Sequence, residues 1–284
     1  MRMLVLGAGG MLGNAVLRVL DEKQEWEAFG TVRSAGVRRF FTDRIADRLI
    51  ALCDVGDSDA LVKVFAQVRP NVVINCIGLV KQLADAGDPL QAIPINSLLP
   101  HHLAGLCSLV DARLVHISTD CVFSGEKGNY TEDDLADAQD LYGRSKFLGE
   151  VYHPHTITLR TSIIGRELQS AHGLVGWFLS QEGACKGYRK AIFSGLPTVV
   201  LAQLIRDVVI PRPDLSGLYH VAAEPISKYD LLKLLASEYG KSIEIVPDDR
   251  VVVDRSLNAN RFKAATGYAA LKWPELVRRM HAFG

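Results

Sequence analysis

Residues 3–13 read Met3-Leu-Val-Leu-Gly7-Ala-Gly-Gly10-Met-Leu-Gly13, an apolar run that leads into a Gly-x-x-Gly-x-x-Gly turn and a helical pattern. Glycine allows positive φ and lets the backbone approach a pyrophosphate closely. The N-terminus of the following helix offers N–H groups and the positive end of its dipole. A strand, a glycine turn and a helix in this order predict a dinucleotide-binding fold. The alternative is a generic tight turn.

Short apolar runs alternate with helical patterns through the first half of the chain. This alternation predicts right-handed βαβ units and an α/β fold, a Rossmann-type doubly wound parallel sheet. The apolar run Val72-Val73-Ile74 fits a strand that is buried on both faces. The strands expected here cover 3–6, 27–32, 72–76, 114–117 and 156–159, and the helices lie near 11–20, 58–67, 89–109 and 142–151.

The second half is less regular and carries no internal repeat or long linker. We therefore expect it to supply a smaller C-terminal α/β lobe packed on the sheet. The elements expected here are a loop followed by a strand over 183–195, a strand over 218–221, a helix over 228–238 capped by Ser227, and a last helix opened by Trp273-Pro274.

These patterns suggest a division of the chain into two parts. We expect residues 1–162 to form the dinucleotide-binding domain, with part of 197–222 returning to it. Residues 163–196 and 223–284 would then form the substrate-binding lobe.

Composition and charge argue against several classes of protein. The 284 residues are 48% apolar and 23% charged with a net charge of +0, which argues against nucleic acid as a partner. No apolar run approaches the roughly 20 residues that span a bilayer, and no signal peptide is recognisable, so we expect no membrane association. Five cysteines without paired spacing suggest reduced thiols in a cytoplasmic protein. No spacing of histidines or cysteines indicates a metal site.

Tyr142-Gly-Arg-Ser-Lys146 places a phenol and an ammonium one helical turn apart on the same face. A tyrosine normally titrates at about pH 10, and a neighbouring lysine stabilises the phenolate and lowers its pKa. The pair could then exchange a proton with a substrate oxygen, the chemistry that interconverts a carbonyl and an alcohol. Ser118-Thr119-Asp120 ends an apolar run upstream. The alternative is a solvated pair on a helix surface.

The end of the second expected strand bears on the choice of cofactor. An NAD site usually carries an acidic residue here for the ribose hydroxyls, but this strand ends Gly30-Thr31-Val32-Arg33. A guanidinium at this point suits the 2′-phosphate of NADP. We therefore expect NADPH, with NADH also usable, and place Asp54 and Val55 near the adenine. The alternative is that Arg33 is a solvated loop residue.

Together these features resemble the extended short-chain dehydrogenase/reductase family, and within it most closely the dTDP-4-dehydrorhamnose reductase branch. The resemblance covers essentially the whole chain. It rests on the motifs Gly7-x-x-Gly10-x-x-Gly13, Ile95-Asn96-x-x-x-Pro100, Ser118-Thr119-Asp120-Cys121-Val122-Phe123-x-Gly125, Tyr130-x-Glu132, Tyr142-Gly143-x-Ser145-Lys146-x-x-Gly149-Glu150, Leu159-Arg160-Thr161-Ser162, Gly195-x-Pro197-Thr198 and Gly217-Leu218-Tyr219-His220.

The resemblance implies a role for the residues that match. Tyr142 would be the general acid, and Lys146 would hold the nicotinamide ribose and tune Tyr142. Thr119 would hydrogen-bond to the substrate oxygen, with Ser118 nearby. The remaining cofactor contacts would come from the glycine turn, from the end of the fourth strand and from the helix that follows it, namely Gly7, Gly10, Met11, Leu12, Gly13, Cys76, Ile77, Gly78 and Asn96.

Two departures from the family pattern concern the sugar pocket. Dehydrorhamnose reductases usually have tyrosine at the position of Cys121 and tryptophan at that of Ile163. Losing both aromatics leaves room for a bulkier or differently substituted sugar, such as a UDP-linked 2-acetamido-2,6-dideoxy-hexos-4-ulose. The alternative is that neighbouring aromatics, Trp177 or Phe123, fill the same space.

We expect the second half to form the substrate pocket, with Cys121 and Ile163 at its floor and the loop 166–176 as a lid. Arg255 is the strongest candidate for a diphosphate contact, because Arg255-Ser-Leu-Asn258 resembles the family's C-terminal substrate segment. The alternative is that many of these charges lie on the surface. The other basic candidates are Lys81, Arg166, Lys186 and Arg189.

Three functions are compatible with this pattern. The first is NADPH-dependent reduction of the 4-keto group of a nucleotide-linked 6-deoxy-sugar, with Tyr142 as proton donor, for the synthesis of surface polysaccharide sugars. The second is a nucleotide-sugar epimerase or dehydratase, although Cys121 stands where resembling dehydratases have a glutamate base. The third is a non-catalytic NADP-binding regulatory subunit, as in the branch that serves methionine adenosyltransferase. A nucleotide-sugar is the expected partner, and a homodimer is compatible with the resemblance.

Overall fold

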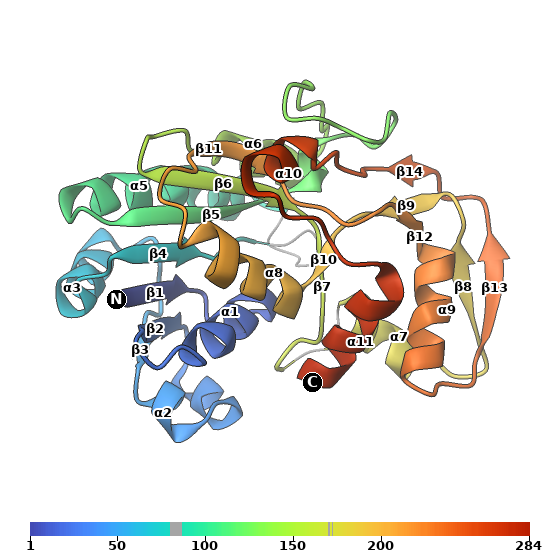
Figure 1. Cartoon of the computed structure of the whole chain (residues 1–284), viewed down its shortest axis with the longest axis horizontal. Coiled ribbons are helices and arrows are strands. Elements are labelled where there is room, and N and C mark those ends of the chain that lie inside the picture. The colour runs from blue at the N-terminus through green and yellow to red at the C-terminus, as the bar shows by residue number, and fades with distance from the viewer. Residues whose placement is uncertain (80–86, 170, 172) are drawn as a thin grey trace. The chain divides into compact units, whose positions relative to one another are not determined.

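A seven-stranded sheet in the order β11-β6-β5-β4-β1-β2-β3 runs through the computed structural model (Figure 1), which describes residues 1–79, 87–169, 171 and 173–284. Lys81 therefore lies outside the described residues. β1 pairs in parallel with β2 and β4, β2 with β3, and β4 with β5. The strands are β1 (Arg2–Leu6), β2 (Glu27–Val32), β3 (Leu49–Ala51), β4 (Val72–Asn75), β5 (Arg113–Thr119), β6 (Thr156–Thr161) and β11 (Gly217–His220).

The strand order confirms the expected fold class. The chain runs from β1 outward to β3, then returns to the other side of β1 and continues outward through β4, β5 and β6. The reversal between β1 and β4 is the switch point of a Rossmann-type fold, where ligands bind at the carboxyl ends of the strands.

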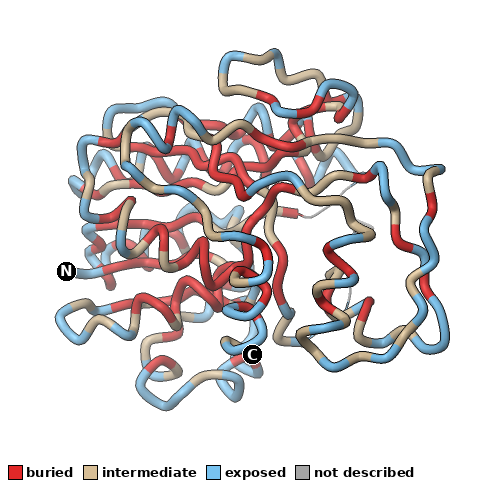
Figure 2. Tube along the Cα trace, turned by 45° about the vertical axis from the view of Figure 1, so that its right-hand side comes forward, coloured by how far each residue is buried: buried red, intermediate tan, exposed pale blue. Residues whose placement is uncertain are grey.

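The helices cover the sheet because each carries an apolar stripe that must be buried. One core cluster joins Leu4 of β1 to Phe65 of α3 and Leu103 of α5, and α1 packs on β1 and β2. Figure 2 shows the buried residues gathered in the strands and the helix faces turned toward them. The helices of this part are α1 (Met11–Asp21), α2 (Asp43–Ala46), α3 (Ser58–Val68), α4 (Pro89–Ala92), α5 (Leu99–Leu109), α6 (Leu141–Leu148) and α8 (Thr198–Leu204).

The chain divides into two compact units by its internal contacts. The first unit comprises 1–118, 139–159 and 202–218, and the second comprises 119–138, 160–201 and 219–284. This grouping differs from the expected division in assigning 119–138 and 160–162 to the second unit. The functional division into a cofactor domain and a substrate lobe stays a prediction.

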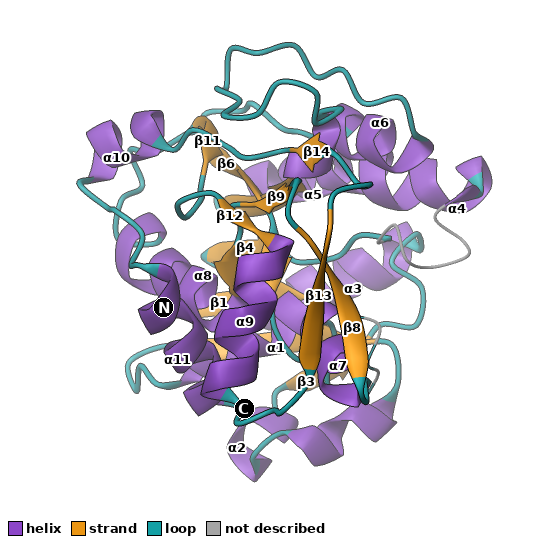
Figure 3. Ribbon diagram, turned by 90° about the vertical axis from the view of Figure 1, so that its right-hand side faces the viewer, coloured by secondary structure: helices purple, strands orange, loops and turns teal. Residues whose placement is uncertain are grey.

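Among the described residues, the second unit contains short strands, four whole α-helices and the first turn of α8, which crosses the boundary between the units. β8 (Ala184–Tyr188) pairs in parallel with β13 (Glu244–Asp248), and α9 (Lys228–Glu238) packs against both strands (Figure 3). Ser227 caps α9, as predicted. The remaining elements are β7 (Ile163–Ile164), β9 (Ala191–Phe193), β10 (Leu196–Pro197), β12 (Ile226–Ser227), β14 (Val253–Asp254), α7 (Leu174–Ser180), α10 (Asn260–Thr266) and α11 (Trp273–Phe283).

Two expected elements are wrong in detail. The helix expected near 89–109 is interrupted by a π-helical turn, Ile93–Leu98, because Pro94 and Pro100 cannot donate the hydrogen bonds of a regular α-helix. The region 183–195, expected to be a loop and one strand, contains both β8 and β9. Pairing with distant strands outweighs its glycine- and lysine-rich composition. In the part of the chain that the structure describes, no helix is long and apolar enough to cross a membrane.

Candidate active site

The glycine turn between β1 and α1 has the geometry that an anion site requires. Gly7 has a φ of +81°, which only glycine adopts readily. A Cβ on Gly13 would lie 2.1 Å from the Gly7 carbonyl oxygen, so α1 closes directly on the loop. Gly10 precedes α1, and no side chain among the described residues caps the helix there. The N–H groups of its first turn can therefore bind a phosphate.

The residues predicted to contact the adenosine follow β2 and β3, two neighbouring strands of the sheet. Val32 of β2 pairs with Ala51 of β3, so the residues after these strands emerge side by side. Arg33 is exposed at this edge. Asp54 accepts a hydrogen bond from the backbone N–H two residues later (2.8 Å), which shapes its own loop. Val55 is half-buried against the core of the first unit.

The segment after Arg33 contains a further arginine, which the sequence analysis did not consider. Arg39 lies in a short 3₁₀ turn, Ala35–Phe40, with its guanidinium 4.8 Å from the ring centre of Phe40. Val37 of the same turn packs 3.6 Å from the Cβ position of Gly9.

Cys76, Ile77 and Gly78 follow β4 and connect the glycine turn to Lys146. A side-chain carbon of Ile77 lies 2.9 Å from the Cβ position of Gly7, and the Cβ position of Gly78 lies 3.7 Å from Lys146 Nζ. Burial raises the pKa of the Cys76 thiol to about 12, so the thiol is protonated and uncharged at physiological pH.

Asn96 joins this segment to α6. It lies in the π-helical turn and is almost fully buried. Its Oδ1 accepts from the Leu79 N–H (2.9 Å), and its Nδ2 donates to Ser145 Oγ (3.2 Å). Asn96 is thus placed to hold the loop after β4 against the helix that carries the predicted tyrosine and lysine.

α6 carries Tyr142 and Lys146 one turn apart, as predicted from their spacing. Asp140 caps the helix by accepting from the Gly143 N–H (2.9 Å). Lys146 is 5% exposed, and its Nζ donates to the Ile117 carbonyl at 2.8 Å. Burial lowers the pKa of Lys146 to about 8, although Glu150 and then Cys76 act in the opposite direction. The pKa of Lys146 therefore lies close to neutral pH, as expected for a group that assists proton transfer.

Ser118 follows Ile117 on β5 and is also buried. Its hydroxyl donates to Glu150 Oε1 at 2.7 Å. Sequence reasoning quoted Glu150 within a motif and gave it no role. The sequence shows that Glu150 lies four residues after Lys146. Because α6 ends at Leu148, this spacing does not predict the direction of the Glu150 side chain.

Thr119 and Asp120 are buried beside the half-buried Cys121 in a polar cluster of the second unit. The Thr119 hydroxyl donates to Asp120 Oδ1 (3.2 Å) and accepts from the Cys121 N–H (3.1 Å). Burial raises the pKa of Asp120, while hydrogen bonds and the charge of Arg255 oppose that shift. Burial, followed by the charge of Asp120, raises the pKa of Cys121 to about 12.

Arg255 belongs to the same cluster, whereas other predicted substrate residues lie elsewhere in the second unit. The Arg255 Nε donates to the Phe123 carbonyl at 2.7 Å. Ile163 is half-buried in β7 and pairs with Leu196 of β10. Arg166 is exposed, and its charge lowers the pKa of Tyr239, which burial raises more strongly.

Two further basic candidates lie at or beside β8. Lys186 is exposed on this strand, and Arg189, just after it, forms a bidentate ion pair with Asp249 (2.7 and 2.5 Å). Of the loop 166–176 expected to be a lid, residues 170 and 172 lie outside the described residues.

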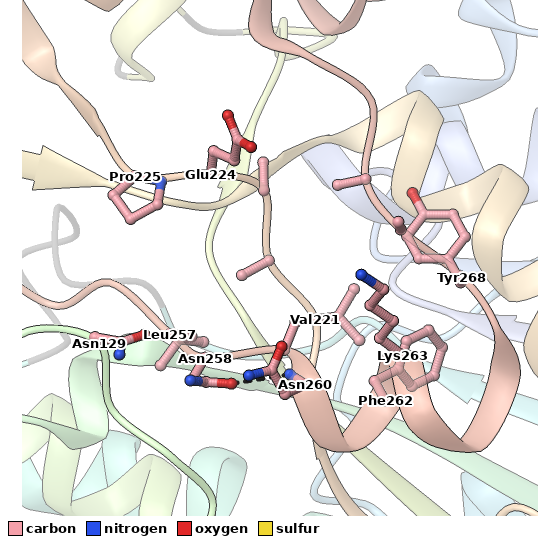
Figure 4. A pocket seen from close by; sticks show the side chains of 15 residues that line it. Asn129, Val221, Glu224, Pro225, Leu257, Asn258, Asn260, Phe262, Lys263 and Tyr268 are labelled. Atoms are coloured by element: carbon pink, nitrogen blue, oxygen red, sulfur yellow. Dashed lines mark hydrogen bonds between the residues drawn. The ribbon is translucent and has the colours of Figure 1, made fainter.

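A pocket of about 380 Å³ lies within the second unit (Figure 4). Its walls come from residues 221–225, 257–260 and 268–270, with Asn129, Phe262 and Lys263. Among the predicted substrate residues that the structure describes, only Asn258 lines it. Asn258 Oδ1 accepts from the Asn260 N–H at 2.9 Å, so this side chain also shapes the start of α10.

Comparison with known proteins identifies related chains of similar length. The profile described as RmlD substrate binding domain matches residues 1–266. A dTDP-4-dehydrorhamnose reductase from Aggregatibacter actinomycetemcomitans is 24% identical, with 99% of each chain covered. Methionine adenosyltransferase 2 subunit beta from Xenopus laevis is 31% identical, with 84% of this chain and 72% of the relative covered. The solved structure of Bacillus anthracis dTDP-4-dehydrorhamnose reductase in complex with NADP has a TM-score of 0.81 at 22% identity, with 100% of this chain and 98% of that chain covered.

Proposed function

Because the chain belongs to the RmlD substrate binding domain family, we propose that it reduces the 4-keto group of a nucleotide-linked 6-deoxy-sugar with NADPH. The expected enzyme class, an NAD(P)-dependent sugar-nucleotide reductase, is confirmed at the level of the family. The observation that carries the finer proposal is the α6 pair. Lys146 is buried one turn from Tyr142, and its Nζ lies 2.8 Å from the carbonyl of Ile117, the residue before Ser118.

The residues around the glycine turn fit a dinucleotide. The uncapped N-terminus of α1 suits a pyrophosphate, and a Cβ at Gly13 would collide with the loop that holds it. When bound, NADPH supplies the hydride that the carbonyl carbon receives. Lys146 holds the ribose and stabilises the phenolate that forms on Tyr142.

Tyr142 gives its proton to the carbonyl oxygen, which becomes the hydroxyl of the product. Thr119 would donate to that oxygen after its single hydroxyl proton turns away from Asp120 Oδ1 (3.2 Å). The Thr119 oxygen accepts from the Cys121 N–H (3.1 Å), which holds the side chain in place while the proton turns. The chain thus supplies the proton and the orientation for the reaction.

The preference for NADPH rests on Arg33. It is exposed beyond the end of β2, where a 2′-phosphate would approach. Charge-assisted hydrogen bonds from a guanidinium favour a phosphate strongly over the hydroxyl of NADH. NADH should still bind, because the pyrophosphate site does not depend on Arg33.

The sugar is proposed from the two departures at the pocket. Cys121 and Ile163 are smaller than the aromatics of dehydrorhamnose reductases, so a UDP-linked 2-acetamido sugar is a substrate to test beside dTDP-4-dehydrorhamnose. Either product would be a precursor of surface polysaccharide. All five cysteines are free thiols, which fits a reducing cytoplasm.

A panel of dTDP- and UDP-linked 4-keto sugars tests the proposal, with oxidation of NADPH followed optically. Turnover with at least one sugar, abolished or strongly reduced in Tyr142→Phe, is the expected result. The matched control is Tyr229→Phe, which removes a phenolic hydroxyl from α9, a helix that contributes no residue to the proposed mechanism, and should retain full turnover. Binding of NADPH without turnover on any sugar would contradict the proposed reductase.

A second candidate function is a non-catalytic NADP-binding regulatory subunit. The similarity to the Xenopus methionine adenosyltransferase 2 subunit beta, at 31% identity, favours keeping it. This alternative predicts tight binding of NADPH and no oxidation with any sugar of the panel. Tyr142→Phe would then leave every measurable property of the protein unchanged.

We also propose a homodimer formed through the first unit. Leu98 of the π-helical turn and Leu148 of α6 are 49% and 61% exposed, and these two elements pack together. Apolar side chains gathered in this way favour association. Light scattering after gel filtration should show a dimer that Leu148→Glu converts to a monomer, and a monomeric wild type would contradict the proposal.

A further inference from the structure

Glu150 is a buried carboxylate that the proposed mechanism does not use. It is 3% exposed and lies two residues beyond the end of α6. A carboxylate in such a place destabilises the fold unless hydrogen bonds and a nearby cation compensate. The hydrogen bonds come from Ser118 and Tyr152 and the opposite charge from Lys146, so two of these three partners belong to the proposed active site.

The two oxygens of Glu150 accept hydrogen bonds from two hydroxyl groups. Ser118 Oγ donates to Oε1 at 2.7 Å, and the Tyr152 hydroxyl donates to Oε2 at 2.9 Å. An ionised carboxylate can only accept, and a serine hydroxyl has only one proton. The proton of Ser118 is therefore committed to Glu150, and the serine oxygen offers only lone pairs to any other group that it meets.

Lys146 supplies the opposing charge. Its Nζ donates to the carbonyl of Ile117, the residue before Ser118 on β5. Lys146 thus binds Ile117 and Glu150 binds Ser118, which are two consecutive residues of β5. This pair of contacts fastens the end of α6 to the end of β5.

Among the described groups that shift the pKa of Lys146, Glu150 is the one that carries a negative charge. Cys76, beyond β4, has its pKa raised to about 12 by burial, so its thiol is neutral. His116 on β5 has a pKa well below its usual value, because of burial first and Lys146 second, and is also neutral. Tyr142 lies one turn earlier on α6 and is the proposed proton donor.

The segment between Lys146 and Glu150 has little freedom to move. A Cβ on Gly149 would lie 1.9 Å from the Asn96 carbonyl oxygen, so the backbone there is pressed against the π-helical turn. The backbone next to Glu150 therefore has little room to shift, and the carboxylate stays within reach of the Ser118 hydroxyl.

We propose that Glu150 is a positioning residue of the active site, which fixes the Ser118 hydroxyl and keeps the neighbouring Lys146 ammonium charged. This inference rests on the proposed function, because Ser118 and Lys146 contribute to catalysis only if the reductase assignment holds. Acting through them, Glu150 would set the pH range in which the enzyme works.

The first test removes the charge with Glu150→Gln and measures the pKa of Lys146 directly. Lysine labelled with ¹³C gives a titrating resonance for Lys146, identified by its loss in Lys146→Arg. The pKa should fall by about one unit or more, the usual effect of losing an opposite charge nearby. The basic limb of the pH profile of kcat/KM should move to lower pH by the same amount. Tyr152→Phe removes a hydrogen bond to Glu150 but keeps its charge, and should move neither quantity.

An identical Lys146 titration in wild type and Glu150→Gln would overturn the proposal. The titration needs no sugar, so an absence of turnover in the wild type would count against the proposed function alone. Glu150→Asp provides a second test if the glutamine variant fails to fold. It keeps the charge but shortens the reach to Ser118, so turnover should fall about tenfold while the basic limb stays in place. Unchanged turnover in Glu150→Asp would overturn the role assigned to Ser118.

Discussion

We expect the protein to lose stability in mild acid because His220, at the end of β11, is buried as a neutral ring. Its Nε2 lies 3.3 Å from a guanidinium nitrogen of Arg160. An arginine can only donate, so Nε2 accepts, and the ring proton lies on Nδ1, which donates to the Tyr130 carbonyl at 3.0 Å. A second proton would have to bind at Nε2, against the charge of Arg160.

The size of the effect follows from the pKa of His220. Burial first and Arg160 second lower it from 6.5 to about 3. As the pH falls, the unfolded chain therefore binds a proton before the folded one does. The stability that this group contributes is fully present above pH 6.5 and is lost as the pH falls toward 3. Each pH unit in this window is worth about 1.4 kcal/mol, so about 2 kcal/mol should be lost by about pH 5.

Denaturant unfolding of the wild type and His220→Gln across this pH range measures the effect. Glutamine can accept from Arg160 and donate to the Tyr130 carbonyl, but it does not titrate. His116 is also buried with a lowered pKa and is present in both proteins, so the difference between the two curves isolates His220. The wild type should lose its advantage over the variant by about 2 kcal/mol between neutrality and about pH 5. Curves that stay parallel would refute the reasoning.

Three further substitutions test the proposed site. Tyr142→Phe should lower turnover ~10²–10⁴-fold with little change in NADPH affinity, since it removes only the transferable proton; steady-state kinetics and calorimetry would report both, and full activity would rule out the mechanism. Arg33→Ala should weaken NADPH about tenfold or more and leave NADH nearly unaffected; equal weakening in fluorescence titrations would show that Arg33 does not bind the phosphate. Arg255→Ala should raise the dissociation constant of the sugar nucleotide and spare that of NADPH; unchanged substrate binding by calorimetry would contradict the placement.

The first half of the fold could be predicted because its signals are local. The glycine turn, the buried run Val72-Val73-Ile74 and the spacing of Tyr142 and Lys146 each depend on residues within one or two turns of chain. Strands that alternate with helices form parallel βαβ units of one favoured handedness, so the class of fold followed from the alternation, whereas the order of the strands came from the structure.

The second half could not be predicted in the same way. β8 is a strand because it pairs with β13, whose residues lie some sixty positions later, as in the pairing of Ala184 with Glu244. Glu150 escaped notice for a related reason. Glu150 accepts a hydrogen bond from Ser118 on β5. The helical spacing of residues on α6 gives no information about which strand lies beside the end of that helix. Contacts of this kind are set by tertiary packing, which propensity does not encode.

The chemistry of Cys121 bears on which reaction the site can perform. A dehydratase needs a base at this position, and a thiol could serve only if it ionised near neutral pH. Burial and the adjacent Asp120 raise the pKa of Cys121 to about 12, which leaves the thiol protonated under physiological conditions. Cys121 therefore carries no charge at physiological pH. A site without a base at this position argues against elimination, whereas the proposed reduction needs none there.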